Sequence, residues 1–176
     1  MIGVHQVVAG AAPRDAITNH VLAAREVIRG MGLRSEIFAE EQHTAGELRD
    51  RIHPHQAWET LTEPGDAAII HYSIDSPAFA HVAAAATRVG IHYHNITPPD
   101  LLWAYAPGLA RQCAEGRKRL RPMVHVASSA AADSAFNASE LIDLDMDDVS
   151  VVGILRGPGL ATAPRAGAAP EAAFFS

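Results

Sequence analysis

The chain alternates short apolar runs with segments in which apolar residues recur every three or four positions. A short apolar run predicts a strand, and recurrence at helical spacing predicts a helix. The pattern predicts strands at 4–9, 35–39, 67–72, 89–94, 124–128 and 149–155. It predicts helices at 15–31, 77–86, 109–120 and 134–141. The polar segment 40–64 is predicted to form a loop with a short helix.

Residues that begin and end helices stand where this pattern needs them. Asp15 and Ser76 suit N-cap positions, and Pro77 suits a first helical turn. Gly30 and Gly32 suit the end of the first helix. The alternation of strand and helix therefore predicts an α/β fold, a Rossmann-like three-layer sandwich with a mostly parallel sheet and right-handed crossovers.

The last 21 residues differ from the rest of the chain. Thirteen of these residues are alanine, glycine or proline, and their apolar positions show no period. Such composition cannot bury enough apolar surface to fold. We expect one Rossmann-like domain at 1–155 and a disordered tail at 156–176.

Composition and charge narrow the functional classes. Fourteen Lys and Arg against twenty Asp and Glu give a net charge of -6 with no basic block, which disfavours nucleic-acid binding through a broad cationic surface. Cys113 is the only cysteine, so an internal disulfide and a multi-cysteine zinc site are excluded. No apolar stretch approaches the roughly 20 residues of a membrane-spanning helix. The residues after Met1 do not form the basic region followed by an apolar core that is typical of a secretory signal. We therefore expect a cytoplasmic protein without a transmembrane segment.

Small and polar residues follow several predicted strands and suggest a site. Parallel strands place their carboxyl ends at one edge of the sheet, where ligands bind. We therefore expect Gly10, Ser73 and His94 to converge on a single crevice, together with Ser128 and Asp133 near another strand end. His94 is the best candidate for acid–base chemistry or for binding a substrate hydroxyl, because imidazole titrates near neutral pH.

These features also have structural interpretations. The loop at 10–15 lacks the spaced glycines of known phosphate-binding loops, so Asp15 equally suits a plain helix cap. His71 and His92 lie inside predicted strands, as hydrogen-bonded core histidines do. His92 and His94 share one face of a strand and suit metal binding by a small hydrolase, but no third ligand follows at a clear spacing.

Two other hydrolase classes find less support. Ser128 and Ser129 lack the G-x-S-x-G motif of α/β-hydrolases. The aspartates between 143 and 148 precede a predicted strand and suit a solvated turn better than the paired carboxylates of a glycosidase.

Six strings, in this order and spacing, resemble glycosyltransferase family 4. They are VHQV at 4–7, RDAITN at 14–19, LRSEIFA at 33–39, IHYSI at 70–74, YHNITPP at 93–99 and NASEL at 137–141. The YHNITPP string is the most specific, and the resemblance covers residues 2–155. It implies the N-terminal, acceptor-side half of a GT-B fold, in which two Rossmann-like domains face each other across a cleft. The implied reaction moves a sugar from a nucleoside-diphosphate sugar to an acceptor hydroxyl with retained configuration.

The resemblance also assigns roles to single residues. His94 matches a cleft histidine that touches the transferred sugar or the acceptor, and it is the implied catalytic residue. Asp15 and Asn19 match a first loop near the donor phosphates or the acceptor. The other implied substrate-binding residues are Gly10, Ser73, Asn95, Thr97, Asn137 and Glu140. No cofactor and no metal is implied, since the nucleotide sugar is a substrate.

The chain departs from the family pattern in two places. Arg14 stands where relatives show glycine. The donor-binding second domain has no counterpart, and segment 156–176 replaces the family's continuation. We therefore expect little or no transfer by the isolated chain, and whether it is an enzyme by itself stays open. The ending suggests a truncated or frameshifted transferase, or one subunit of a split enzyme that pairs with a separate donor-binding domain.

The expected partners follow from this resemblance. They are a sugar nucleotide and a glycan or lipid-linked acceptor, with the inner membrane face as a peripheral location. The alternative from another class is a non-catalytic domain that binds a glycan or a protein partner. Binding of UDP- or GDP-sugars by the chain alone would contradict the incomplete-site interpretation.

Overall fold

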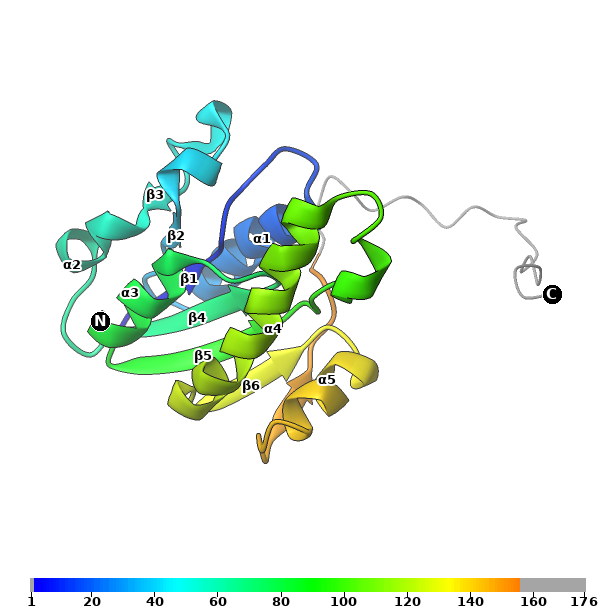
Figure 1. Ribbon diagram of the computed structural model, residues 1–176. Coiled ribbons are helices and arrows are strands. Elements are labelled where there is room, and N and C mark those ends of the chain that lie inside the picture. Colours follow the sequence, from blue (N-terminus) through cyan, green and yellow to red (C-terminus); the bar gives the residue numbers. More distant parts are fainter. Residues whose placement is uncertain (1, 156–176) are drawn as a thin grey trace, which may run out of the picture.

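The computed structural model describes residues 2–155, which form a parallel sheet flanked by helices (Figure 1). The strands are β1 (Val4–Val7), β2 (Ile37–Ala39), β3 (His53–Pro54), β4 (Ala67–Tyr72), β5 (Arg88–Tyr93), β6 (Ser129–Ala132) and β7 (Val149–Val151). The helices are α1 (Ala16–Gly30), α2 (Trp58–Leu61), α3 (Pro77–Ala85), α4 (Pro107–Val126) and α5 (Ala135–Ile142). The strand order is β3-β2-β1-β4-β5-β6-β7, and all six pairings are parallel. The predicted Rossmann-like α/β fold is confirmed.

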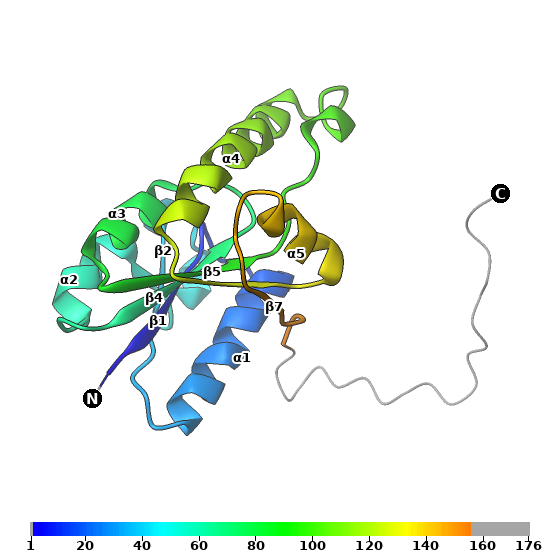
Figure 2. The ribbon, with the colours of Figure 1, turned by 90° about the horizontal axis from the view of Figure 1, so that it is seen from below.

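The helices are divided unequally between the two faces of the sheet. Figure 2 shows α1 on one side, and α3, α4 and α5 on the other. The larger core lies on the side of α3 to α5, where buried Tyr72 and Tyr93 pack in one cluster with Phe79 and Leu120. A smaller cluster around Val21 lies under α1. Because side chains alternate along a strand, every second residue of β4 and β5 faces the α1 side.

The strand order places a topological switch point between β1 and β4. From β1 the chain moves outward through β2 to β3, and it then returns to the other side of β1 and continues from β4 to β7. The loops after β1 and β4 therefore separate at the carboxyl edge of the sheet. In open α/β sheets this is where a crevice forms and ligands bind.

Three of the predicted helix starts are confirmed and have a local cause, whereas the helix predicted from 109 begins at Pro107 without a side-chain cap. The Asp15 carboxylate accepts a hydrogen bond from the Thr18 backbone N–H at 2.7 Å, directly before α1. The Ser76 and Ser134 hydroxyls accept from backbone N–H groups in the first turns of α3 and α5. Gly32 follows α1 at φ +79°, a conformation that glycine adopts without strain.

The predicted strand at 124–128 is wrong, and the error moves a strand end. Val124 is buried in the last part of α4, which continues past Pro122 to Val126. The strand instead lies later in the chain, as β6, and its alanines pair in register with β5 (Ile91 opposite Ala130). This pairing is a long-range interaction that overrides the weak strand propensity of alanine. The short edge strand β3, inside the predicted loop at 40–64, was likewise not predicted.

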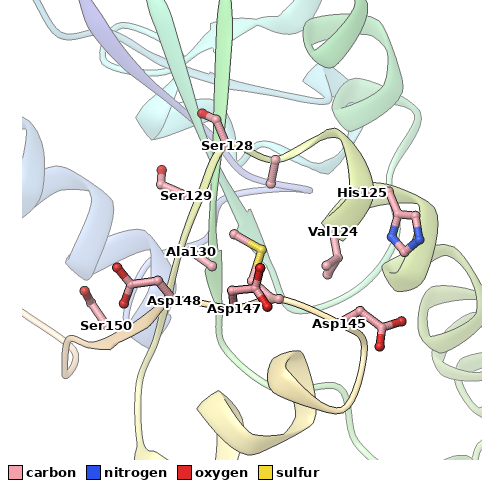
Figure 3. Close-up of a pocket in the computed structure, with 11 residues that line it drawn as sticks. Val124, His125, Ser128, Ser129, Ala130, Asp145, Asp147, Asp148 and Ser150 are labelled. Atoms are coloured by element: carbon pink, nitrogen blue, oxygen red, sulfur yellow. The ribbon is translucent and has the colours of Figure 1, made fainter.

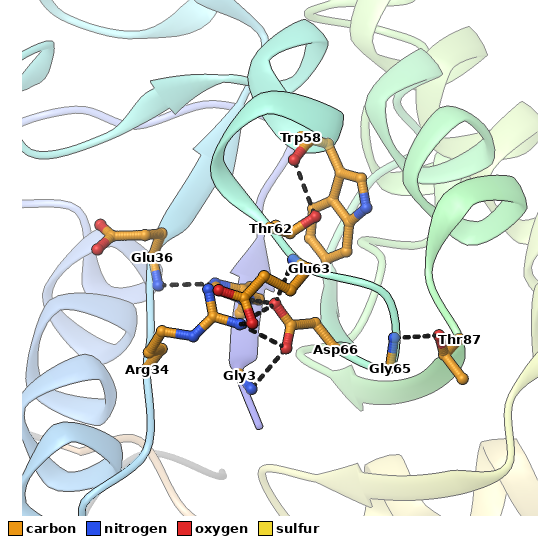
Figure 4. A network of polar contacts seen from close by, with 10 residues as sticks. Gly3, Arg34, Glu36, Trp58, Thr62, Glu63, Gly65, Asp66 and Thr87 are labelled. Atoms are coloured by element: carbon orange, nitrogen blue, oxygen red, sulfur yellow. Dashed lines mark hydrogen bonds and ion pairs between the residues drawn. The ribbon is translucent and has the colours of Figure 1, made fainter. Parts of the chain in front are cut away.

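A buried carboxylate organises the amino edge of the sheet (Figure 4). Asp66, 3% exposed, accepts hydrogen bonds from the backbone N–H groups of Gly3 at 2.6 Å and Glu63 at 2.8 Å. Arg34 Nη2 lies 2.9 Å from Asp66 Oδ2, and His5 Nε2 lies 3.0 Å from it. These partners come from β1, from the chain before β2 and from the turn before β4. The Asp66 side chain therefore joins three segments at the amino ends of neighbouring strands.

Two sequence predictions concern features beyond this core. The predicted disorder of 156–176 lies outside the described residues. Within residues 2–155, the structure contains no helix with both the length and the apolar character needed to cross a membrane.

Candidate functional site at the carboxyl edge of the sheet

A cavity of about 670 Å³ opens at the switch point between β1 and β4. Its lining comes from the loops after β1, β2 and β4 and from α4: Ala9, Gly10, Glu40, Gln42, His43, Ile74, Asp75, Pro77, Arg111, Gln112 and Glu115. Three carboxylates and one guanidinium therefore line it. It lies at the sheet edge where a single crevice was expected, but of Gly10, Ser73 and His94 only Gly10 lines it.

Gly10 lies where the backbones of two loops meet at this cavity. A Cβ atom at Gly10 would lie 2.7 Å from the His43 carbonyl oxygen and 2.8 Å from the His43 Cβ. These distances are shorter than van der Waals contact, so a side chain at this position would push the loops apart. Gly10 thus shapes the cavity through its backbone.

Asp15 functions as a helix cap in this structure. Its Oδ2 accepts hydrogen bonds from the Thr18 N–H at 2.7 Å and from the Thr18 hydroxyl at 2.8 Å. Arg14 adopts φ 64°, a left-handed conformation that glycine adopts more easily than arginine. Asn19 is half-buried in the first turn of α1. The predicted contacts of Asp15 and Asn19 with substrate remain predictions.

Removing this cap should have a modest effect. The Asp15→Ala variant should lose about 1 kcal/mol of stability, while Asp15→Asn, which also caps helices, should lose less. Chemical denaturation monitored by circular dichroism measures both variants. Equal losses for the two would show that the Asp15 charge, rather than the cap hydrogen bond, is what stabilises this helix.

Hydrogen bonds among Tyr93, Arg117 and Glu140 connect the end of β5 to α4 and α5. The Tyr93 hydroxyl donates to Glu140 Oε2 at 2.9 Å, and Arg117 Nη1 donates to Glu140 Oε1 at 3.0 Å. Burial and the neighbouring Glu140 raise the pKa of Tyr93 above its ordinary value. Asn95, at φ 71°, accepts a hydrogen bond from Arg117 Nη2 at 3.5 Å. In this structure Glu140 and Asn95 therefore brace the edge of the sheet.

The remaining predicted residues lie at the same edge but in different surroundings. Ser73 is half-buried and directly precedes Ile74, which lines the cavity. Thr97 is exposed, and Asn137 is buried in the first turn of α5. His94 follows β5, yet its side chain is only 1% exposed. Its ring lies among other histidines on the α1 face, so His94 does not line the cavity with Gly10.

Four histidines lie together on the α1 face of the sheet. His71 and His92 stand opposite each other in register on β4 and β5, and His20 reaches them from α1. His94 Nε2 lies 2.9 Å from His71 Nδ1, and His94 Nδ1 lies 2.9 Å from Asp133 Oδ2. One ring nitrogen from each of the four histidines lies within 4.8 Å of the others. We call this group the histidine cluster.

Burial keeps the histidine cluster uncharged at neutral pH. Burial, followed by the neighbouring His92 and His94, lowers the pKa of His20 to about 4. Burial, followed by His92, lowers the pKa of His94 to about 4, although Asp133 acts in the opposite direction. Burial also lowers the pKa of His71 and of His92. His71 and His92 are buried, and each has a polar partner for one ring nitrogen.

The serines predicted at this edge lie at the opposite one. Ser128 and Ser129 precede or begin β6, so they lie at its amino end and line a hollow with Asp145, Asp147 and Asp148 (Figure 3). The physical reason is the displaced strand: β6 ends at Ala132, and Asp133 and Ser134 follow it at the carboxyl edge. The serines therefore lie away from the expected crevice, and Asp133 lies at the expected edge but contacts His92 and His94 rather than the cavity.

Sequence reasoning missed Gln6, His20 and the clustering of His71 with His94. One signal was available: the tripeptide Ile-His-Tyr occurs at 70–72 and again at 91–93. In neighbouring parallel strands it places two imidazoles side by side on one face. No local pattern indicates that His20, on a helix, packs against the same face.

Comparisons with known proteins support the fold. No protein-family model matches the chain, and no curated protein matches it either, so the resemblance to glycosyltransferase family 4 remains a prediction. Among solved structures, the chain is similar to an alpha-glucosyltransferase in complex with UDP, with a TM-score of 0.55 and 13% identity over 86% of this chain. A second similar structure is an alpha-glucosyltransferase in complex with UDP and a 13-mer DNA containing an HMU base, with a TM-score of 0.55 and 12% identity over 88% of this chain.

The chain spans 43% of the length of each of these two proteins. At this identity the similarity concerns the fold alone. It agrees with a Rossmann-like domain that makes up one half of a GT-B fold.

Proposed function

We propose that this chain is the acceptor-side half of a retaining glycosyltransferase that moves a sugar from a nucleoside-diphosphate sugar to an acceptor hydroxyl. The observation that carries the proposal is the cavity at the switch point, in a fold similar to 43% of two UDP-bound glucosyltransferases. The six family-like strings agree with this assignment. A donor-binding half, supplied by another chain or another segment, completes the site.

The charges around the cavity support the acceptor side. Glu40, Asp75 and Glu115 contribute three carboxylates, and Arg111 contributes one guanidinium. Arg119 and Lys118 pair with Asp75 and Glu115, so the described lining lacks the cluster of unpaired cations that would bind an anionic nucleoside diphosphate. Carboxylate and amide groups such as those of Glu40 and Gln112 instead suit the hydroxyls of a sugar.

The lining is also held in place before any ligand binds. Glu40 Oε1 accepts a hydrogen bond from the Ser76 hydroxyl at 2.6 Å, and Glu40 Oε2 accepts one from Gln42 at 2.9 Å. Asp75 forms an ion pair with Arg119 at 3.3 Å. Groups fixed in this way lose little freedom on binding, which favours recognition of a weakly bound acceptor.

The isolated chain should therefore lack transfer activity. We expect no detectable hydrolysis of UDP- or GDP-sugars by the chain alone, because half a cleft cannot stabilise the charge that develops on the leaving diphosphate. Adding a candidate donor-binding domain should produce sugar transfer with retained anomeric configuration. NMR of the product measures the configuration. Turnover or micromolar donor binding by the chain alone would refute the assignment.

A second measurement tests the acceptor side directly. Glycan binding, measured by NMR or calorimetry, should weaken in Gln112→Ala, since Gln112 is exposed and lines the cavity. The matched control is His125→Ala, an exposed residue of the same helix that does not line the cavity. Equal glycan binding by both variants would place the acceptor elsewhere.

A further inference from the structure

The histidine cluster contains a row of polar groups with an acceptor at each end. At one end, Gln6 Nε2 donates to the Val21 carbonyl oxygen at 2.9 Å. This contact turns the amide oxygen of Gln6 towards His71 Nε2, 3.1 Å away. At the other end, Asp133 Oδ2 lies 2.9 Å from His94 Nδ1.

These two ends determine where the ring protons lie. Since an amide oxygen and a carboxylate only accept, His71 Nε2 and His94 Nδ1 must be the protonated nitrogens. In neutral rings the other nitrogens, His71 Nδ1 and His94 Nε2, then carry lone pairs. They face each other at 2.9 Å with no hydrogen between them. Two lone pairs at this distance repel each other. The contact between His71 Nδ1 and His94 Nε2 is therefore stable only if a proton or a metal cation lies between the two nitrogens.

His92 has the same arrangement. Its Nε2 lies 2.9 Å from Asp133 Oδ1 and 3.1 Å from the Val152 carbonyl oxygen. Both of these neighbours are hydrogen-bond acceptors, so His92 Nε2 carries the proton. His92 Nδ1 then carries a lone pair that can coordinate a metal ion. His71 is only 2% exposed, so bulk water does not solvate the lone pair of its Nδ1 freely, whereas His92 lines an open groove.

We propose that His71, His92 and His94 bind a zinc ion, with His20 as the fourth ligand. The ion supplies the cation that the contact between His71 Nδ1 and His94 Nε2 requires. The Asp133 carboxylate and the Gln6 amide oxygen accept from the outer ring nitrogens, as carboxylates and backbone carbonyl oxygens commonly do around metal-bound histidines. This site is in addition to the proposed sugar transfer and differs from the sequence expectation that no metal is bound.

The dimensions and donor types fit zinc. Zinc–imidazole bonds of about 2.0–2.1 Å in a tetrahedron place the ligand nitrogens roughly 3.3 Å apart. The His71 and His94 nitrogens are 2.9 Å apart and the whole set lies within 4.8 Å, so small ring movements suffice. His20 would exchange the hydrogen bond that its Nδ1 accepts from the Leu155 N–H, at 2.9 Å, for the metal. Four imidazoles favour zinc, copper or nickel over magnesium or calcium.

The ion also has an entry path. An apolar groove of about 420 Å³ runs along the α1 face, and His20, His71 and His92 contribute to its lining. A bound ion would tie α1 to β4 and β5 next to the switch point. The expected role is therefore to fix the carboxyl edge of the sheet.

Metal analysis of the full chain, purified without a histidine tag, tests the proposal. We expect one zinc ion per chain by mass spectrometry, and an intense visible spectrum typical of tetrahedral cobalt after exchange with Co²⁺. Added zinc should raise the melting temperature of chelator-treated protein. Competition with a chromophoric chelator should show at least tenfold weaker zinc binding by His92→Gln and His20→Gln.

The matched control is His125→Gln, which alters an exposed histidine outside the cluster. It should bind zinc as the unchanged chain does. If His92→Gln fails to fold, the cobalt spectrum of the unchanged chain still decides. The proposal is overturned if the chain shows no zinc, no cobalt spectrum and no zinc-dependent melting shift, or if ¹⁵N NMR shows that a proton charges the His71–His94 pair instead. None of these measurements depends on sugar transfer, so the two proposals fail separately.

Discussion

The Asp66→Ala variant should lose roughly 3–5 kcal/mol of unfolding free energy, the cost of removing one partner from a buried ion pair. Asp66 is 3% exposed and joins β1, the chain before β2 and the turn before β4. Its removal leaves the Gly3 and Glu63 N–H groups without their acceptor. Arg34, whose side chain is 30% exposed, can turn to water, so we expect the lower end of the range. Urea denaturation measures the loss.

The control for this variant is Asp50→Ala. Asp50 is exposed, and its replacement should change stability by less than about 0.5 kcal/mol, as for most surface substitutions. Equal stability of the two variants would contradict the central role of Asp66 at the amino edge.

The same carboxylate should produce an acid-dependent loss of stability. Burial acts to raise the pKa of Asp66, but hydrogen bonds from Glu63, His5 and Gly3 outweigh it and lower the pKa below the ordinary 3.8. The contribution of Asp66 is therefore complete above pH ~4 and is lost as the pH falls through its folded-state pKa. The difference in stability between the unchanged chain and Asp66→Ala should narrow below pH ~4, and denaturation between pH 7 and 2.5 measures it.

The Asp133→Ala variant should have the second largest effect, about 3–5 kcal/mol in chelator-treated protein, from two lost hydrogen bonds to a charged group. Asp133 accepts from His92 Nε2 and His94 Nδ1, both at 2.9 Å. The Val152 carbonyl still accepts from His92 afterwards, but the buried His94 N–H is left with no acceptor among the described residues. Chelation keeps any metal contribution out of this measurement, which thermal and urea unfolding can both supply.

The exposed Asp143 serves as the comparison for Asp133. Asp143→Ala leaves the histidine cluster intact and should be close to neutral. A loss below about 1 kcal/mol in Asp133→Ala would mean that water, or a change of imidazole tautomer, replaces the carboxylate at little cost.

The two edges of the sheet have different properties. The amino edge is fixed by the buried Asp66 and its partners. At the carboxyl edge, the strand order separates the loops after β1 and β4, and a cavity remains between them. The proposed acceptor site therefore lies at the carboxyl edge, as expected for open parallel sheets, and Asp133 stabilises that same edge through His92 and His94.

Much of the fold was predictable because it depends on local causes. The strand at 67–72 matches β4 because an apolar run suits a strand buried on both faces. Asp15 and Ser76 cap α1 and α3 because their side chains reach N–H groups two or three residues ahead. By contrast, the alanines of β6 form a strand only through pairing with β5, which no window of sequence contains.

The candidate site divides in the same way. The sequence by itself determined that small or polar residues such as Gly10 and His94 follow parallel strands, and therefore that they share one edge of a Rossmann-like sheet. Only the tertiary structure decided that the His94 ring turns into a cluster with His20, His71 and His92, while Gly10 faces a separate cavity. The physical reason is that strand direction follows from the connections along the chain, whereas the position of a ring depends on residues from α1, β4 and β6 that meet only after folding.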